Sequence, residues 1–166
     1  MKFLKTYLSL MEANNSKSVV VIKIDSRKRE VNLVKIDDWN YKKIYDLIGH
    51  GCRNFEVPFV FDNEDTLYTD GEFAIKEFSS EVDENGFYYP GDYGFILLPY
   101  YKKFVFLGNA VITGSNDEGE TVSVKSTLEL IRREIVFVNI NREEGEYEYY
   151  EWDSLSNKYK KSEHND

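Results

Sequence analysis

The residues best placed to do chemistry lie in Gly49-His50-Gly51-Cys52, where an imidazole and a thiol are close in the chain. A nucleophilic thiol needs a proton acceptor beside it. Neighbours in sequence rarely face each other, and the only other histidine is His164. We therefore interpret the stretch as a loop that follows a helix, with Cys52 leading into the next strand and His50 free to donate to a ligand. We expect no catalytic residue.

Metal and cofactor motifs are missing from the sequence. Cys52 is the only cysteine, which excludes an internal disulfide, and two histidines are too few to complete a zinc cluster with it. The acids of 62–65 lack the glycine and the twelfth-position glutamate of a calcium loop. Neither a phosphate-binding loop nor a dinucleotide fingerprint occurs. We expect no metal and no cofactor.

Basic residues at turns are the better indication of ligand chemistry. Arg27, Lys28 and Arg29 fall in a predicted hairpin loop, and Arg53 follows the first predicted helix. Arginine forms charge-assisted hydrogen bonds that suit phosphate, and tyrosine rings can stack on bases. Basic and aromatic groups at turns thus predict a ligand site made of Arg27, Lys28, His50, Arg53, Tyr68, Tyr88, Tyr89, Tyr93 and Tyr101.

Charge is distributed unevenly along the 166 residues, whose formal net charge is -9. Residues 62–92 carry ten acids and one base, whereas the segment before Asp62 carries eleven bases and seven acids. Duplex DNA binding requires many phosphate neutralisations, so this balance argues against it. The acidic stretch could instead cover a partner's nucleic-acid-binding face, and a local basic site for a small anion is compatible with the rest.

Alternating and β-branched patterns predict strands in the first half at 18–24, 30–36, 55–61 and 66–69. Pro58 places the third of these near an edge or a bulge, because proline cannot donate a ladder hydrogen bond. A helix is predicted between them, with Asp37 or Asp38 as N-cap and Gly49 at its end.

The second half predicts a long loop over 79–94, then a strand over 103–114 with a bulge or close approach at Gly108. A short strand at 121–124 precedes a capping box that begins with Ser126 and starts a second short helix. Residues 135–140 form the last predicted strand, followed by a charged, Tyr-rich tail.

These elements predict a single α+β domain, mainly an antiparallel sheet with two short helices. Its parts are an N-terminal segment at 1–18, the domain at 19–141 and the C-terminal tail at 142–166. No apolar run reaches the length of a signal peptide or a membrane span, so we expect no membrane association and a location in the cytoplasm.

The order of elements resembles a family of small uncharacterised proteins of phages and bacteria over residues 19 to 140. The segments that carry the resemblance include Ile44–Gly49, Phe55–Val57, Leu67–Asp70, Phe106–Gly114 and Asn116–Val124. It is a match of glycines, turns and core positions, and it supplies no catalytic signature. The chain departs from it by the acidic, aromatic segment at 79–94 and by its tail.

The composition also resembles that of phage proteins that evade host immunity by acting as sponges. Such proteins trap cyclic nucleotide signals of bacterial CBASS or related defences. This resemblance implies a non-enzymatic protein that sequesters a small nucleotide messenger, as a homo-oligomer whose exposed aromatics at 87–101 form the assembly surface. Two alternatives stay open: an acidic inhibitor or accessory protein that binds a host factor through 62–92, and an enzyme that degrades a nucleotide signal with His50 as general base.

Overall fold

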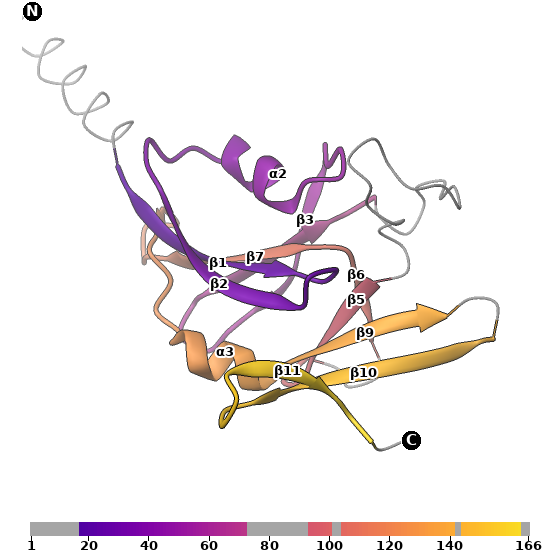
Figure 1. Ribbon diagram of the computed structural model, residues 1–166. Coiled ribbons are helices and arrows are strands. Elements are labelled where there is room, and N and C mark those ends of the chain that lie inside the picture. The colour runs from indigo at the N-terminus through magenta and orange to yellow at the C-terminus, as the bar shows by residue number, and fades with distance from the viewer. Residues whose placement is uncertain (1–16, 73–92, 101–103, 142–143, 164–166) are drawn as a thin grey trace, which may run out of the picture.

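The computed structural model describes residues 17–72, 93–100, 104–141 and 144–163 (Figure 1). Two antiparallel sheets and two short helices form these parts of the chain. The prediction of an α+β domain, mainly antiparallel sheet with two short helices, is confirmed.

The first sheet has the strand order β2-β1-β7-β4-β3, and β8 pairs with the end of β7. Its members are β1 (Val19–Asp25), β2 (Glu30–Ile36), β3 (Phe55–Val60), β4 (Thr66–Asp70), β7 (Ala110–Ser115) and β8 (Thr121–Val122). As the proline predicts, β3 is an edge strand, and its register shifts between Glu56 and Phe59. The hairpin of β1 and β2 forms the other side of the sheet, and its loop spans 26–29.

The second sheet has the strand order β11-β10-β9-β5-β6. Its members are β5 (Tyr93–Leu97), β6 (Phe106–Leu107), β9 (Ile135–Asn141), β10 (Glu146–Asp153) and β11 (Lys158–Lys161). Figure 1 shows this sheet below the first, with the two packed face to face. Their shared core includes Ile22 and Leu67 from the first sheet, and Phe95 and Phe137 from the second.

The two helices cover different places. Helix α2 (Lys42–Ile48) lies on the outer face of the first sheet, where Ile44 and Ile48 pack against Val19, Val21 and Val111. Helix α3 (Leu128–Glu134) closes one end of the space between the sheets, and its Ile131 joins the shared core. Alternate residues of β1 therefore face two different apolar layers.

The helix starts differ from those predicted. Thr127, one residue after the predicted Ser126, caps α3 by accepting a hydrogen bond from the Leu130 backbone N–H. The N-cap position of α2 is Tyr41, which makes no side-chain cap bond. Asp37 instead accepts a hydrogen bond from the Ser18 hydroxyl. The prediction of Gly49 at the end of α2 is correct, with φ at 71°.

Three predicted stretches are organised differently. The strand predicted over 103–114 is two strands in two sheets, β6 and β7, separated at Gly108. The described end of the predicted 79–94 loop begins β5, an inner strand of the second sheet. The tail predicted from 142 is wrong for 146–161, which form β10 and β11, because alternate tyrosines and a tryptophan there pack toward the core.

Candidate ligand-binding site

The chain passes from the second sheet to the first at Gly108-Asn109, between β6 and β7. Gly108 has a φ of 79°, which favours glycine, and its N–H donates to the Tyr93 carbonyl oxygen at 2.9 Å. The Ser26 hydroxyl donates to the Gly108 carbonyl oxygen. This one crossing therefore ties the start of β5 to the loop of the β1–β2 hairpin.

Asn109 extends the connection to a third loop. Its Oδ1 accepts from the Ser26 backbone N–H at 3.0 Å, and its Nδ2 donates to the Ile48 carbonyl oxygen at 3.3 Å. The same Nδ2 lies 3.4 Å from His50 Nε2. Asn109 is 8% exposed, so its amide is a buried link between segments that lie 59 to 83 residues away. We call Ser26, His50, Gly108 and Asn109 the junction.

His50 has an uncommon backbone for a residue with a side chain. Its φ is 52°, between Gly49 and Gly51 at 71° and 67°, and the residue is exposed. Left-handed residues other than glycine are rare and gather at functional positions, although histidine adopts this region more readily than most. The contact with Asn109 places the ring at the surface end of the junction.

On its other side the hairpin loop lies over the second sheet. The Arg29 guanidinium carbon is 4.0 Å from the centroid of the Tyr150 ring. The Tyr150 hydroxyl donates to Glu148 at 3.1 Å, and the ammonium group of Lys161 is 3.2 Å from the other oxygen of that carboxylate. The Asn139 side-chain amide donates to the Tyr150 hydroxyl at 3.5 Å. We call Arg29, Asn139, Glu148, Tyr150 and Lys161 the polar cluster.

The protonation states in the polar cluster suit binding. Hydrogen bonds from Lys161 and Tyr150 lower the pKa of the Glu148 carboxyl below its ordinary value. Burial, and then the bond to Glu148, raise the pKa of the Tyr150 hydroxyl. A carboxylate with a lowered pKa is a weak base, and a phenol with a raised pKa keeps its proton. The arrangement offers fixed charges, a ring and hydrogen-bonding groups.

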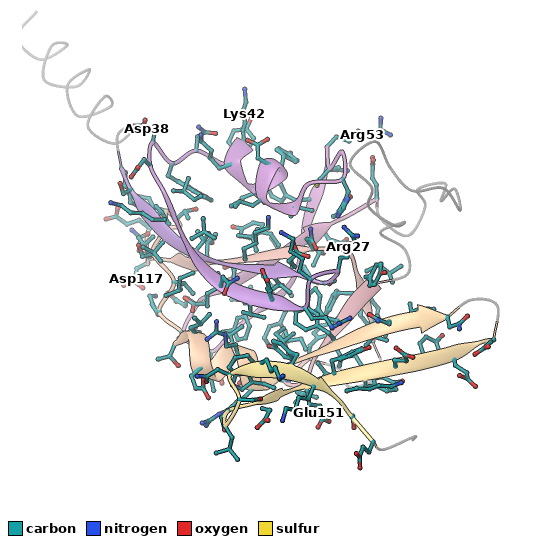
Figure 2. The ribbon with its side chains drawn as sticks, in the orientation of Figure 1. Arg27, Asp38, Lys42, Arg53, Asp117 and Glu151 are labelled. Atoms are coloured by element: carbon teal, nitrogen blue, oxygen red, sulfur yellow. The ribbon has the colours of Figure 1, made fainter. Side chains whose placement is uncertain are left out.

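The structure brings four of the predicted site residues to this end of the first sheet. Arg27 and Lys28 occupy the hairpin loop next to Ser26, and Figure 2 labels Arg27 there. Tyr93 accepts the Gly108 bond through its backbone and is paired with Asn139 across β5 and β9. His50 reaches the same junction through Asn109.

The remaining predicted residues have other surroundings. Arg53 is exposed and its Nε lies 2.8 Å from a Glu72 carboxylate oxygen, which raises the pKa of the guanidinium. Tyr68 packs edge-on against Phe55, with ring centroids 5.2 Å apart, in the layer beneath α2. Tyr88, Tyr89 and Tyr101 lie outside the described residues. Within 87–101, Phe95 is fully buried, which removes it from the predicted assembly surface, while Tyr100 is 41% exposed.

Sequence reasoning missed the side chains that hold the site together. Asn109 follows a glycine inside an apolar stretch, and a buried amide there could have signalled a link between segments. Asn139 occupies the core-facing row of β9 after Ile135 and Phe137, so the alternation itself marks it as an inward polar residue. Tyr150 lies in the segment that the sequence predicts to be a tail, where no partner is expected for its ring.

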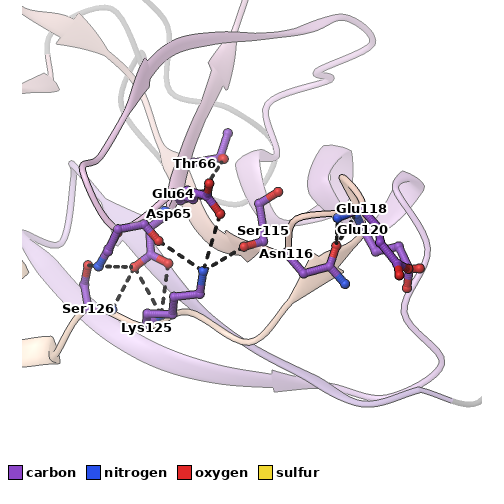
Figure 3. A network of polar contacts seen from close by, with 10 residues as sticks. Glu64, Asp65, Thr66, Ser115, Asn116, Glu118, Glu120, Lys125 and Ser126 are labelled. Atoms are coloured by element: carbon purple, nitrogen blue, oxygen red, sulfur yellow. Dashed lines mark hydrogen bonds and ion pairs between the residues drawn. The ribbon is translucent and has the colours of Figure 1, made fainter.

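A second polar network lies at the opposite end of β7 (Figure 3). The Asp65 carboxylate, which is fully buried, accepts from the backbone N–H groups of Lys125 and Ser126 at 2.7 to 3.1 Å. Asn63 donates to Asp65 and to the Ser126 hydroxyl. The Lys125 ammonium donates to the Ser115 and Asn63 carbonyl oxygens. This network attaches the approach to α3 to the β3–β4 turn.

The described acids between 62 and 72 are used largely within the protein. Asp65 and Asp70 are buried, and Glu72 and Glu64 approach Arg53 and Lys125 at 2.8 and 3.9 Å. The other acids of the 62–92 stretch lie outside the described residues. Asp62 and Glu64 are exposed, so the described part of this stretch presents negative charge at these two positions.

The described residues offer neither a metal site nor a membrane-spanning helix. They contain no group of three or more histidine, cysteine or acidic side chains that could hold a metal ion. No helix within them is long and apolar enough to cross a membrane.

Comparison with protein-family models, with curated proteins and with solved structures found no match to the chain. The resemblance drawn from the sequence stays a prediction, and the functional argument depends on the geometry of the junction and the polar cluster.

Proposed function

We propose that this protein binds and sequesters a small anionic ligand of the nucleotide class, without turning it over, at the end where the hairpin loop meets the junction. The observation that carries the proposal is the position of Asn109. Its amide joins the basic hairpin loop to the His50 loop, and its neighbour Gly108 joins both to Tyr93. Cationic and imidazole groups from two loops, and an aromatic residue at the start of β5, thus lie on segments that Gly108 and Asn109 connect.

Charge and exposure support an anion rather than a neutral ligand. The hairpin loop contributes three consecutive bases, and Lys28 among them is exposed. Arginine and lysine donate charge-assisted hydrogen bonds to phosphate oxygens.

The pKa directions support binding rather than catalysis. A general base works best with a pKa near the working pH, and Glu148 moves away from it. We propose a cyclic oligonucleotide as the ligand, such as a CBASS messenger of the host that a phage protein would sequester. That part of the proposal, together with a homo-oligomeric state, rests on the resemblance noted from the sequence.

The test is to incubate the purified protein with cyclic dinucleotides, cyclic trinucleotides and cyclic ADP-ribose isomers, remove it by filtration, and analyse both fractions. We expect one class to be depleted from the filtrate and recovered chemically intact after heat denaturation. A double substitution of Arg27 and Lys28 by alanine should abolish the depletion. Recovery of a chemically altered ligand would indicate an enzyme, and His50→Ala would then test whether His50 is its general base. If every nucleotide of the panel stays in the filtrate unchanged, the proposal is overturned.

A further inference from the structure

Asn139 occupies a position where the sheet pattern calls for an apolar residue. On β9, Ile135 and Phe137 point into the core between the sheets and are fully buried. Asn139 continues that row, opposite Tyr93 on β5 and Glu148 on β10. The inner face of the second sheet therefore becomes polar at the end that the hairpin loop covers.

The Asn139 side chain is only half satisfied. Its Nδ2 faces the Tyr150 hydroxyl at 3.5 Å, but its Oδ1 is buried and has no hydrogen-bond partner. Burying an unpaired acceptor is costly, so such atoms are rare in folded proteins and call for an explanation. Of the four buried unpaired side-chain atoms in the described residues, this one belongs to the polar cluster.

We infer that Asn139 selects the base of the ligand by accepting a hydrogen bond from an exocyclic amine. The inference rests on the proposed function and adds the chemical identity of the base. The base stacks on the Tyr150 ring in place of Arg29, and the released guanidinium pairs with the ligand's phosphate. Stacking of a base on an aromatic ring stabilises more than a cation–π contact near the surface, so the exchange favours the ligand.

The unpaired acceptor, Asn139 Oδ1, then makes the site selective between bases. Adenine and cytosine carry an amine where hypoxanthine and uracil carry a carbonyl oxygen. An amine donates to Asn139 Oδ1, while a carbonyl oxygen faces it as a second acceptor and repels it. A site that hydrogen-bonds a substrate group rejects the analogue without it, because its own polar group stays unpaired.

The experiment uses two matched pairs of probes: cyclic di-AMP with cyclic di-IMP, and cyclic di-CMP with cyclic di-UMP. Dissociation constants are measured by isothermal titration calorimetry with the full chain. We expect the amine-bearing member of at least one pair to bind about tenfold more tightly, the effect of one such hydrogen bond. Asn139→Leu should reduce that ratio to about one, with the larger loss on the amine-bearing ligand.

Thr113→Val is the matched control, because it also removes a buried, unpaired polar atom, from the first sheet. It should leave the ratio unchanged, and thermal unfolding should show both variants folded. Equal binding of the two members of each pair, or a ratio that survives Asn139→Leu, would overturn the inference and leave the proposed function intact. If the protein retains only ligands whose bases carry no exocyclic amine, the inference is likewise overturned and the proposed function stands. If no nucleotide of the larger panel is retained, the proposed function falls and the inference with it.

Discussion

Each end of β7 has a polar network centred on one buried side chain, and the two networks differ in the groups that surround them. Asp65 accepts from two backbone N–H groups and from Asn63, and Lys125 closes the network over two carbonyl oxygens. Asn109 also joins three segments, but its network ends in the exposed His50 and lies beside an exposed lysine loop.

The difference separates a network that stabilises the fold from the proposed binding site. The Asp65 network is complete within the protein, which suits a role in holding α3 against the first sheet. The junction fixes backbone and leaves cations and a ring at the surface, and the adjoining polar cluster keeps one buried acceptor unpaired. A buried polar network therefore does not by itself indicate a site, because exposed charged groups or an unpaired buried acceptor beside it are needed as well.

Substitution of Asp65 should have the largest effect on stability. Asp65→Ala leaves the Lys125 and Ser126 N–H groups unpaired in a buried place, so we expect a loss of about 3 kcal/mol in the free energy of unfolding. Urea unfolding followed by circular dichroism measures it. Nucleotide affinity of the folded fraction should not change. A variant as stable as the parent would show that the Asp65 network does not stabilise the fold.

Substitution of Asn109 should lower both stability and affinity. Asn109→Ala removes the bond to the Ser26 N–H and the contact with His50, so we expect a loss of about 1–2 kcal/mol and at least tenfold weaker ligand binding. Asn63→Ala is the comparison, because it removes an amide from the other network. If both variants lose affinity equally, the junction has no special role in binding.

Substitution of Lys28 should affect affinity alone. Lys28 is exposed, so Lys28→Ala should leave the free energy of unfolding unchanged and weaken nucleotide binding severalfold, more at low salt than at high salt. Lys35→Ala, an exposed lysine at the far end of the same hairpin, is the control. If Lys28→Ala and Lys35→Ala bind nucleotide with the same affinity, the hairpin loop is not part of the site.

The smallest expected effect is a pH dependence at the β10–β11 hairpin. Hydrogen bonds from Lys160 and Ser156 lower the pKa of Asp153 from 3.8 to about 2. Because the folded-state pKa is the lower one, the stabilisation is complete above about pH 4 and is lost as the pH falls through about 2. Asp153→Asn should thus be slightly less stable than the parent at pH 5.

That difference should disappear toward pH 2, as measured by urea unfolding at several pH values. Screening by salt should reduce it, since the pair is exposed. A difference that stays constant over this range would mean that the Asp153 charge contributes nothing to the hairpin.

Local patterns predicted the strands of the first sheet well. Alternation in 18–24 and 30–36, with basic turn residues between them, indicated the β1–β2 hairpin, and Pro58 indicated an edge. These features depend on neighbours in sequence, so they are readable without the fold. The predicted site residues Arg27, Lys28, His50 and Tyr93 lie on segments that Gly108 and Asn109 connect, and their role in binding stays a prediction.

The second sheet could not be predicted in the same way. Gly108 looks like a bulge within one strand, and only the tertiary structure shows that the chain changes sheets there. The charged residues of 146–161 resemble a tail because their outward positions alternate with the inward Tyr150, Trp152 and Tyr159. Asn109 acts through partners 59 to 83 residues away in the sequence, which no local pattern reports.

The most direct test of the central claim is to map where a nucleotide binds, by amide chemical-shift changes in NMR spectra of the full chain titrated with cyclic dinucleotides. The account predicts shifts at residues 26–29, at His50, at Gly108 and Asn109, and along the inner face of the second sheet near Asn139. Shifts confined to 62–72, or to the Asp65 network, would contradict it. The absence of any shift with the whole panel would contradict the proposed function itself.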